Sequence, residues 1–99
     1  MEIRKTRVIV VYDISDDRLR TRIAAYLKTT GLSRVQRSVF IGPLTRTQRT
    51  NLEAGLRRLT RGWTNYSIHI YTIPEPNYAT RIIIEKGYTL KEEETEYLI

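Results

Sequence analysis

Short apolar stretches alternate along this chain with stretches whose apolar residues have helical spacing. Val8-Ile9-Val10-Val11-Tyr12 is a continuous apolar run that ends at Asp13, and such a run is typical of a central strand covered on both faces. The next apolar residues recur at i, i+4, i+7 and i+8, and they are Leu19, Ile23, Tyr26 and Leu27. This spacing predicts a helix with one apolar face. Ser15 or Asp16 is expected to cap its first turn, and Gly31 to end it in the left-handed conformation.

A β-rich segment and a second helical pattern follow. Residues 34–41 predict either one kinked strand or a very tight pair of short strands, closed by Gly42-Pro43. Thr45 and Gln48 fit a capping box, in which each side chain accepts a hydrogen bond from the other residue's backbone N–H. The apolar stripe of this second helix consists of Leu52, Leu56 and Leu59. Gly62 is expected to terminate it.

The last third of the chain predicts further extended structure. Residues 66–73 alternate in polarity, as a strand with two different faces does, and Pro74 and Pro76 close it. Residues 81–84 predict a final short strand. Residues 92–94 are all Glu, and we expect either a solvated tail or a short edge element there.

The order of these elements is strand, helix, strand or strand pair, helix, strand. It predicts an α+β fold with two helices on one face of a mainly antiparallel sheet. With 99 residues, the chain suits a single domain, residues 1–99, in which the residues from about 88 form an acidic C-terminal tail. Because the helices cover only one face of the sheet, a second copy of the chain is the simplest cover for the other face, so we expect a homodimer.

The distribution of charge along the chain indicates what kind of partner the protein binds. The net charge is +6, and residues 1–61 carry 14 Lys and Arg against 5 Asp and Glu, whereas residues 62–99 carry 3 against 6. A basic body indicates a polyanionic partner, and the preference for Arg favours phosphate, although many soluble domains carry excess basic residues for solubility alone. The chain has no Cys, no apolar run long enough to span a membrane and no signal-peptide pattern. We therefore expect a cytoplasmic protein that does not bind a membrane.

Asp13 is the residue most suited to chemistry. A carboxylate directly after a buried strand lies at the rim of the sheet, where active sites often form. Mg²⁺ prefers oxygen ligands and often needs only one or two carboxylates besides water and substrate phosphate. One Asp per chain is a poor site by itself, but two copies facing each other across a twofold axis make a plausible one. The alternative interpretation is that Asp13 caps the following turn or helix.

Basic residues follow Asp13 in the first predicted helix. Arg18, Arg20 and Arg22 can hold phosphate or stabilise charge in a transition state, or they can form an ordinary solvated helix face. Asp16 and Asp17 are better explained as a cap and as a complement to the helix dipole than as metal ligands.

Four other side chains have both a structural and a chemical interpretation. Tyr12 and Phe40 are either core or interface residues, or they stack on an unpaired base. Ser38 can donate to a phosphate, but a strand Ser is usually structural. His69 is the only His, and a mid-strand His is more often packed than catalytic. No catalytic triad and no Walker or Rossmann phosphate loop can be assembled from this sequence.

Two sequence blocks resemble a known family. Val10-Val11-Tyr12-Asp13-Ile14 with Asp16-Asp17-Arg18-Leu19-Arg20-Thr21-Arg22 is similar to the opening of the small CRISPR-associated endonuclease of spacer acquisition, the Cas-two family. The stretch from Gly31 to Gly42 is similar to its second signature, and the blocks have the family's spacing. The resemblance spans residues 8 to about 87.

This resemblance implies a ferredoxin-like fold and a homodimer in which the last strand reaches the partner's sheet. It also implies that Asp13 of each chain binds a shared Mg²⁺ or Mn²⁺. The positions that match residues tied to cleavage in the family are Tyr12, Asp13, Arg20, Arg22, Arg34 and Phe40. The other positions expected to contact nucleic acid are Arg18, Arg37, Ser38, Arg46, Arg49 and Arg57.

Three functional hypotheses follow. The first is a metal-dependent endonuclease that cleaves RNA or double-stranded DNA and acts in spacer acquisition with the CRISPR integrase subunit. The second is a non-catalytic dimeric scaffold that grips duplex DNA through its basic surfaces. The third is a toxin-like ribonuclease of related fold.

Overall fold

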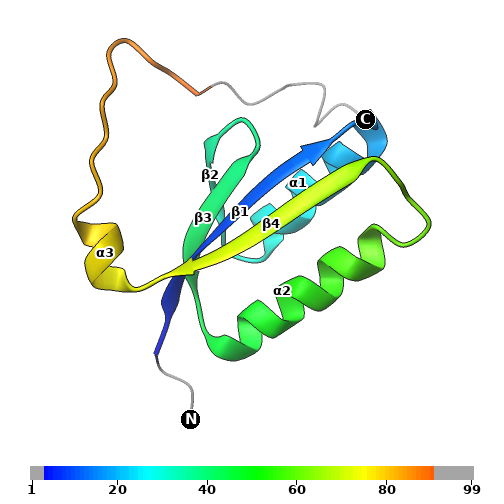
Figure 1. Cartoon of the computed structure of the whole chain (residues 1–99), viewed down its shortest axis with the longest axis horizontal. Helices are drawn as coiled ribbons and strands as arrows, with labels where there is room; N and C mark the ends of the chain where they lie inside the picture. Colours follow the sequence, from blue (N-terminus) through cyan, green and yellow to red (C-terminus); the bar gives the residue numbers. More distant parts are fainter. Residues whose placement is uncertain (1–3, 91–99) are drawn as a thin grey trace.

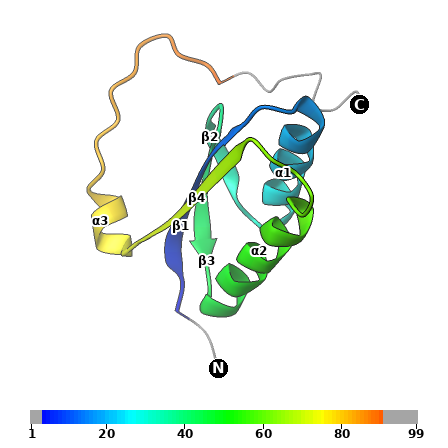
Figure 2. The same ribbon diagram turned by 45° about the vertical axis from the view of Figure 1, so that its right-hand side comes forward.

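Four strands form one antiparallel sheet in the order β2-β3-β1-β4 (Figure 1) in the computed structural model, which describes residues 4–90. The strands are β1 (Thr6–Ile14), β2 (Ser33–Gln36), β3 (Val39–Leu44) and β4 (Tyr66–Ile73). The helices are α1 (Asp17–Thr29), α2 (Arg46–Leu59) and the short α3 (Glu75–Ala79). Helices α1 and α2 lie together on one face of the sheet (Figure 2). The predicted α+β, ferredoxin-like sandwich is confirmed.

The central strand β1 divides its side chains between two different environments. It pairs with both β3 and β4, so its predicted central position is confirmed. Val8, Val10, Tyr12 and Ile14 are buried beneath the helices, whereas Val11 is 37% exposed. The helices lie on one face only, as the order of the elements predicts, so within a single chain the second face of β1 has no helical cover. We call the other face, which carries Val11, the open face.

The two long helices begin and end where the sequence predicts. Asp16 caps α1, and Thr45 and Gln48 form the complete capping box of α2. Gly31 and Gly62 have φ values of 91° and 84° and follow the last turns of α1 and α2, a conformation that glycine adopts without steric cost. The core side chains that these helices contribute are Leu19, Ile23, Ala24, Leu27, Leu52 and Leu56.

Residues 33–44 form a tight strand pair. Strands β2 and β3 pair antiparallel through a two-residue connection, Arg37-Ser38. The predicted end at Gly42-Pro43 is wrong, because β3 continues through both residues to Leu44. Pro43 is tolerated there because the pairing of β2 stops at Ile41, which leaves β3 with an unpaired edge that needs no N–H donor from Pro43.

The chain after β4 differs most from the prediction. Pro74 and Pro76 do not merely close the strand, because they begin α3, whose first turn accommodates proline. The predicted strand at 81–84 is not formed, since the sheet of residues 4–90 contains only β1 to β4. An extended segment needs a neighbouring strand to complete its hydrogen bonds, and this one lies apart from both sheet edges (Figure 1). The glutamates at 92–94 lie outside the described residues.

Residues 81–90, which we call the arm, leave the body at a cluster of side chains around α3. The Arg7 guanidinium donates to both carboxylate oxygens of Glu75, at 2.7 and 3.2 Å. The guanidinium carbons of Arg7 and Arg81 lie 4.1 and 3.9 Å from the centre of the Tyr78 ring. These contacts fix α3 against β1 and set the direction in which the arm departs. No helix within residues 4–90 is long and apolar enough to cross a membrane.

Gly42 provides a test of this packing. A Cβ atom added there would lie 2.9 Å from the Gly31 carbonyl oxygen and 3.2 Å from the Leu32 Cα, and backbone atoms cannot move aside easily. We expect Gly42→Ala to lower the free energy of unfolding by about 1–3 kcal/mol, measured by urea denaturation. Ser33→Ala is the control, because Ser33 is exposed on the neighbouring strand β2 and the change only removes a hydroxyl. Equal costs for the two variants would contradict this account.

Candidate functional site at the rim of the sheet

Asp13 lies near the carboxyl end of β1 and is exposed on the open face. It stands opposite Ser67 of β4 in the strand register. Its carboxylate makes no hydrogen bond or ion pair with any of residues 4–90. The alternative role as a helix cap is excluded, because the Asp16 Oδ1 atom accepts from the backbone N–H groups of Arg18 and Leu19 at 2.8 and 3.1 Å. Asp13 is therefore an oxygen ligand available to an external partner.

Backbone hydrogen bonds bring two connections to the end of the sheet where β1 ends. The Tyr12 N–H donates to the Ser38 carbonyl at 3.1 Å, which places the β2–β3 turn beside the end of β1. The Ser15 N–H donates to the Asn65 carbonyl at 3.2 Å, which ties the α2–β4 connection to the same end. Arg37 is exposed and Ser38 half-buried in the turn. Ser38 is a turn residue and not a strand residue, so its hydroxyl lies at the rim.

Arg20 is held at this rim by two contacts. Its Nη1 atom donates to the Ile14 carbonyl at 3.0 Å, and its Nη2 atom forms an ion pair with the Asp17 carboxylate. The Arg20 guanidinium is thus bound to the backbone of Ile14, the residue that follows Asp13 in β1. Arg18 and Arg22 lie on the exposed surface of α1, one helical turn apart.

The sheet separates the remaining predicted cleavage residues from Asp13. Tyr12 and Phe40 are 3% and 0% exposed, with ring centres 6.2 Å apart in the core under the helices. The Arg34 guanidinium lies 5.2 Å from the centre of the Phe40 ring, and Arg34 pairs with Phe40 in register, so it belongs to the helix side of β2. In one chain, Tyr12 and Phe40 support the strand that carries Asp13 from beneath, and Arg34 also borders the cavity between β2 and the arm.

The arginines of α2 spread along the length of that helix. Near the beginning of α2, Arg46 is exposed and Arg49 is half-buried. The helix begins just after Leu44 of β3, which pairs with Thr6 at the start of β1. This end of β1 lies far from Asp13. Arg57 is exposed in the last turn, nearer the Asp13 end, and donates to Glu53 at 2.9 Å. The α2 surface is a separate basic surface, not part of the Asp13 site.

A divalent cation fits this site only in part. The Asp13 carboxylate has the oxygen chemistry that Mg²⁺ and Mn²⁺ prefer. Within residues 4–90, however, no group of three or more His, Cys, Asp or Glu side chains is placed to hold a metal ion. One chain therefore supplies a single carboxylate ligand, and a second chain is needed for a second one.

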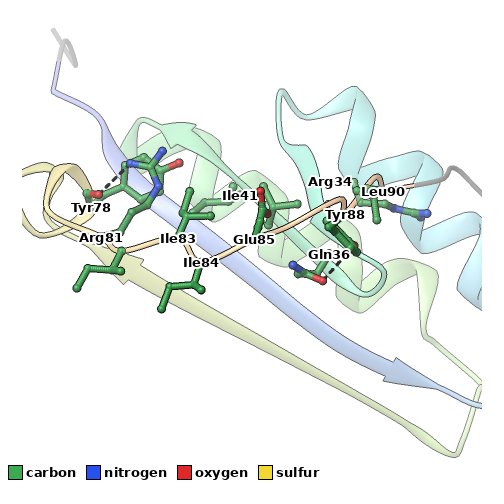
Figure 3. Close-up of a pocket in the computed structure, with 12 residues that line it drawn as sticks. Arg34, Gln36, Ile41, Tyr78, Arg81, Ile83, Ile84, Glu85, Tyr88 and Leu90 are labelled. Atoms are coloured by element: carbon green, nitrogen blue, oxygen red, sulfur yellow. Dashed lines mark hydrogen bonds between the residues drawn. The ribbon is translucent and has the colours of Figure 1, made fainter.

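The open face is apolar on β1, β2 and β3, whereas β4 presents Ser67, His69 and Tyr71 there. The arm overlies part of this face. Ile9 and Ile41 are half-buried there, and Val11 and Val35 are 37% and 40% exposed. A cavity of about 630 Å³ separates the arm from β2 and β3, and the Tyr88 Oη donates across it to the Gln36 Oε1 at 3.3 Å (Figure 3). The arm leaves Ile82 and Ile84 85% and 92% exposed. Within the described chain, this apolar surface remains uncovered.

Two residues acquire a setting that sequence reasoning did not anticipate. The expected packing of His69 is wrong, because β4 is an edge strand and His69 is exposed beside Tyr71, with 3.0 Å between Nδ1 and Oη. No apolar pattern in the sequence predicts a role for Trp63. It lies at the Asp13 end of the sheet, with the Arg18 guanidinium over its ring. The signal that could have identified it is a lone Trp in the short connection between Gly62 and Asn65, where no helical or strand stripe requires a large apolar residue.

Comparison with known proteins gives a consistent result. A family model described as CRISPR associated protein Cas2 matches residues 6–81. The CRISPR-associated endoribonuclease Cas2 of Korarchaeum cryptofilum is 52% identical over 56 residues, which cover 57% of this chain and 60% of that protein. A CRISPR-associated endoribonuclease Cas2 of Pyrobaculum aerophilum is 39% identical over 77 residues, covering 78% of this chain and 84% of the relative.

A fused relative and two solved structures extend the comparison. A CRISPR-associated endonuclease Cas1/endonuclease Cas2 fusion from Thermoproteus tenax is 36% identical over 77 residues, covering 78% of this chain and 29% of the fusion. A structure titled as a crystal structure of cas2 superposes with a TM-score of 0.69 at 30% identity, covering 90% of this chain and 98% of that one. A hypothetical protein from Thermus thermophilus superposes with a TM-score of 0.68 at 32% identity, covering 89% and 99%.

Asp16 gives the rim a predictable response to acid. Hydrogen bonds from the backbone N–H groups of Leu19 and Arg18 lower the pKa of Asp16 below its ordinary value of 3.8. A carboxylate with a depressed pKa in the folded state stabilises the fold above its unfolded pKa, and this contribution is lost as the pH falls through the folded pKa. We expect Asp16→Asn, which keeps a capping oxygen but cannot titrate, to lose less thermal stability than wild type between about pH 5 and pH 3. Parallel thermal midpoints for the two proteins across that range would contradict this assignment.

Proposed function

This chain belongs to the CRISPR-associated Cas2 family, and we propose that it is a metal-dependent endonuclease that cleaves phosphodiester bonds in RNA or DNA. The proposal includes a role in spacer acquisition together with the CRISPR integrase subunit. Two relatives that match 57% and 78% of this chain are named endoribonucleases, and the fusion of a Cas1 with a Cas2 in Thermoproteus tenax supports a Cas1 partner.

The observation that carries this proposal is the unengaged carboxylate of Asp13 on an apolar open face. Within residues 4–90 no side chain or backbone group binds this carboxylate, so it is free of those residues to bind an external cation. We propose that a second copy covers the open face. The two Asp13 carboxylates, one from each copy, would then hold a single shared Mg²⁺ or Mn²⁺. When bound, the cation supplies positive charge that polarises the scissile phosphate.

The chain's own residues have separate tasks in this reaction. In hydrolysis the oxygen of water bonds to phosphorus and loses a proton to solvent. The bond from phosphorus to the leaving nucleotide oxygen breaks, and that oxygen takes up a proton from solvent. Arg20, held by Ile14 and Asp17, is placed to neutralise charge that grows on the phosphate oxygens, and Arg37 and Ser38 offer donors from the adjacent turn. Tyr12, Phe40 and Arg34 act indirectly by packing the β1 segment that presents Asp13. Arg22 is proposed to contact phosphate farther along α1.

The second candidate is a duplex-binding scaffold, favoured by the basic surface of α2. Arg46 and Arg57 are exposed and Arg49 is half-buried on α2, which packs on the face of the sheet opposite to the open face that carries Asp13 (Figure 2). Such a surface contacts phosphates without reading sequence. The two roles use different surfaces, so one protein can carry both.

Asp13 is the residue that decides whether the first role exists. We expect Asp13→Asn to lower the rate of phosphodiester cleavage in Mg²⁺ by at least about 100-fold, because it removes the metal-binding charge while keeping the shape of the side chain. Cleavage of labelled RNA and duplex DNA measures the effect. Glu53→Gln is the control, since Glu53 is an exposed carboxylate on α2 that binds Arg57. Undiminished cleavage by purified Asp13→Asn protein would refute the nuclease proposal.

The α2 surface is tested by charge reversal. We expect the combined change of Arg46, Arg49 and Arg57 to Glu to weaken duplex DNA binding by at least about tenfold at physiological salt, because three phosphate contacts are lost and three repulsions are added. Binding by Asp13→Asn protein should be unchanged in the absence of metal. Fluorescence anisotropy across a salt series measures both. If the reversed protein binds duplex DNA as wild type does, the scaffold does not use α2.

A further inference from the structure

We propose that Trp63 and Arg18 form a binding subsite for one unpaired nucleobase and its phosphate, beside the Asp13 rim. This inference rests on the proposed function, because it assigns to the same site a way of holding single-stranded RNA. A pocket of about 410 Å³ lies at this position, lined by Ser15, Asp16, Gly62, Trp63, Thr64 and Asn65. That volume is within the range of pockets that hold small ligands, about 300–1,000 Å³.

The Trp63 ring is held in place before any ligand arrives. The backbone N–H of Trp63 donates to the Thr60 carbonyl at 2.9 Å. The Trp63 ring packs against the hydrophobic core and stays partly exposed. Gly62 and Asn65 on either side have φ values of 84° and 60°, so the connection turns sharply and lifts the ring to the rim. A fixed aromatic ring loses little entropy on binding, as a stacking platform requires.

The polar surroundings suit the rest of a nucleotide. Ser15, Thr64 and Asn65 line the pocket together with Asp16, and hydroxyl and amide side chains of these types can offer donors and acceptors to the edge of a base. The Arg18 guanidinium carbon lies 5.5 Å from the ring centre, and the Arg18 side chain is 73% exposed. Arg18 also pairs with the Asp16 carboxylate, with 3.7 Å between Nε and Oδ1. A base that stacks on this face of the ring therefore takes the place of the guanidinium, which turns outward to a phosphate.

The pocket is close enough to Asp13 to hold the same strand. Ser15 is two residues beyond Asp13, so their Cα atoms are at most about 7 Å apart, and Ser15 bonds to Asn65 across the rim. A duplex cannot use this pocket, because the faces of its bases are hidden by their neighbours, whereas an unpaired base offers its face to an aromatic side chain. The geometry thus selects single-stranded substrate.

The lone Trp makes the proposal directly measurable. Asp13→Asn protein in EDTA, which cannot cleave, is titrated with a short unstructured single-stranded RNA and with a blunt RNA duplex of equal length. We expect saturable quenching of Trp emission by the single strand and little by the duplex, while anisotropy of the labelled nucleic acid reports binding of each. If the single strand binds by anisotropy but leaves Trp emission unchanged, or if the duplex quenches equally, the proposal is overturned.

Side-chain variants then separate stacking from packing. Trp63→Leu keeps an apolar side chain but has no aromatic face, and we expect it to weaken single-strand binding about tenfold, whereas Trp63→Phe should stay within about threefold of wild type. Arg18→Gln should make the slope of the logarithm of the binding constant against the logarithm of the salt concentration shallower, by about the amount expected for one phosphate contact. Equal losses for Leu and Phe, with both proteins folded by circular dichroism, would show that Trp63 only packs. If Trp63→Leu fails to fold, the quenching experiment decides.

Failure of this inference and failure of the proposed function are distinguishable. Base binding is measured without metal in a protein that lacks the Asp13 carboxylate, so it does not depend on cleavage. Cleavage is lost or retained on substitution of Asp13 whether or not Trp63 contacts a base.

Discussion

The two-residue period of β1 is the constraint on which the site depends. Burial of Val8, Val10, Tyr12 and Ile14 against α1 and α2 fixes the orientation of the whole strand. Because successive side chains of a strand point to opposite faces, burying Tyr12 obliges Asp13 to lie on the open face. A shift of register by one residue would bury the carboxylate and expose the core. The packing of Tyr12 with Phe40 thus positions Asp13 without touching it.

The same strand end gathers the groups that surround Asp13. The Asp16 cap begins α1 immediately after β1, the Ile14 carbonyl anchors Arg20, and the Ser38 and Asn65 carbonyls draw two connections to the rim. Each of these contacts uses a backbone group that needs a partner where regular structure ends. Backbone groups at the ends of the strands and helices therefore stabilise the rim. They also anchor there a hydrogen-bond donor, the Arg20 guanidinium.

The opposite end of β1 fixes the arm. Arg7 binds Glu75 and lies over Tyr78, which Arg81 also contacts, so one residue of β1 holds α3 and the first residue of the arm. The arm then carries three consecutive isoleucines past the sheet with little burial. An apolar arm and an apolar open face on one molecule both lack cover in the described chain, and an assembly of two copies would resolve both.

Local sequence determined the elements whose signals are local. The helix caps at Asp16 and Thr45, the apolar stripes of α1 and α2, and the glycine ends at Gly31 and Gly62 follow from hydrogen-bonding groups and side-chain spacing within a few residues. The position of Asp13 at a strand end is also readable, because the apolar run stops there. The resemblance of the two sequence blocks to the family was confirmed by the match over residues 6–81.

Tertiary structure decided the features that depend on neighbours distant in the sequence. Whether residues 34–41 form one strand or two depends on the pairing of β3 with β1, and the absence of a strand at 81–84 depends on whether a sheet edge is within reach. His69 is exposed because β4 is an edge strand and its outer side chains lie on the open face. The Trp63 pocket joins residues almost fifty positions apart, and periodicity along the chain cannot report such a meeting, because it arises from the folding of separate elements onto one rim.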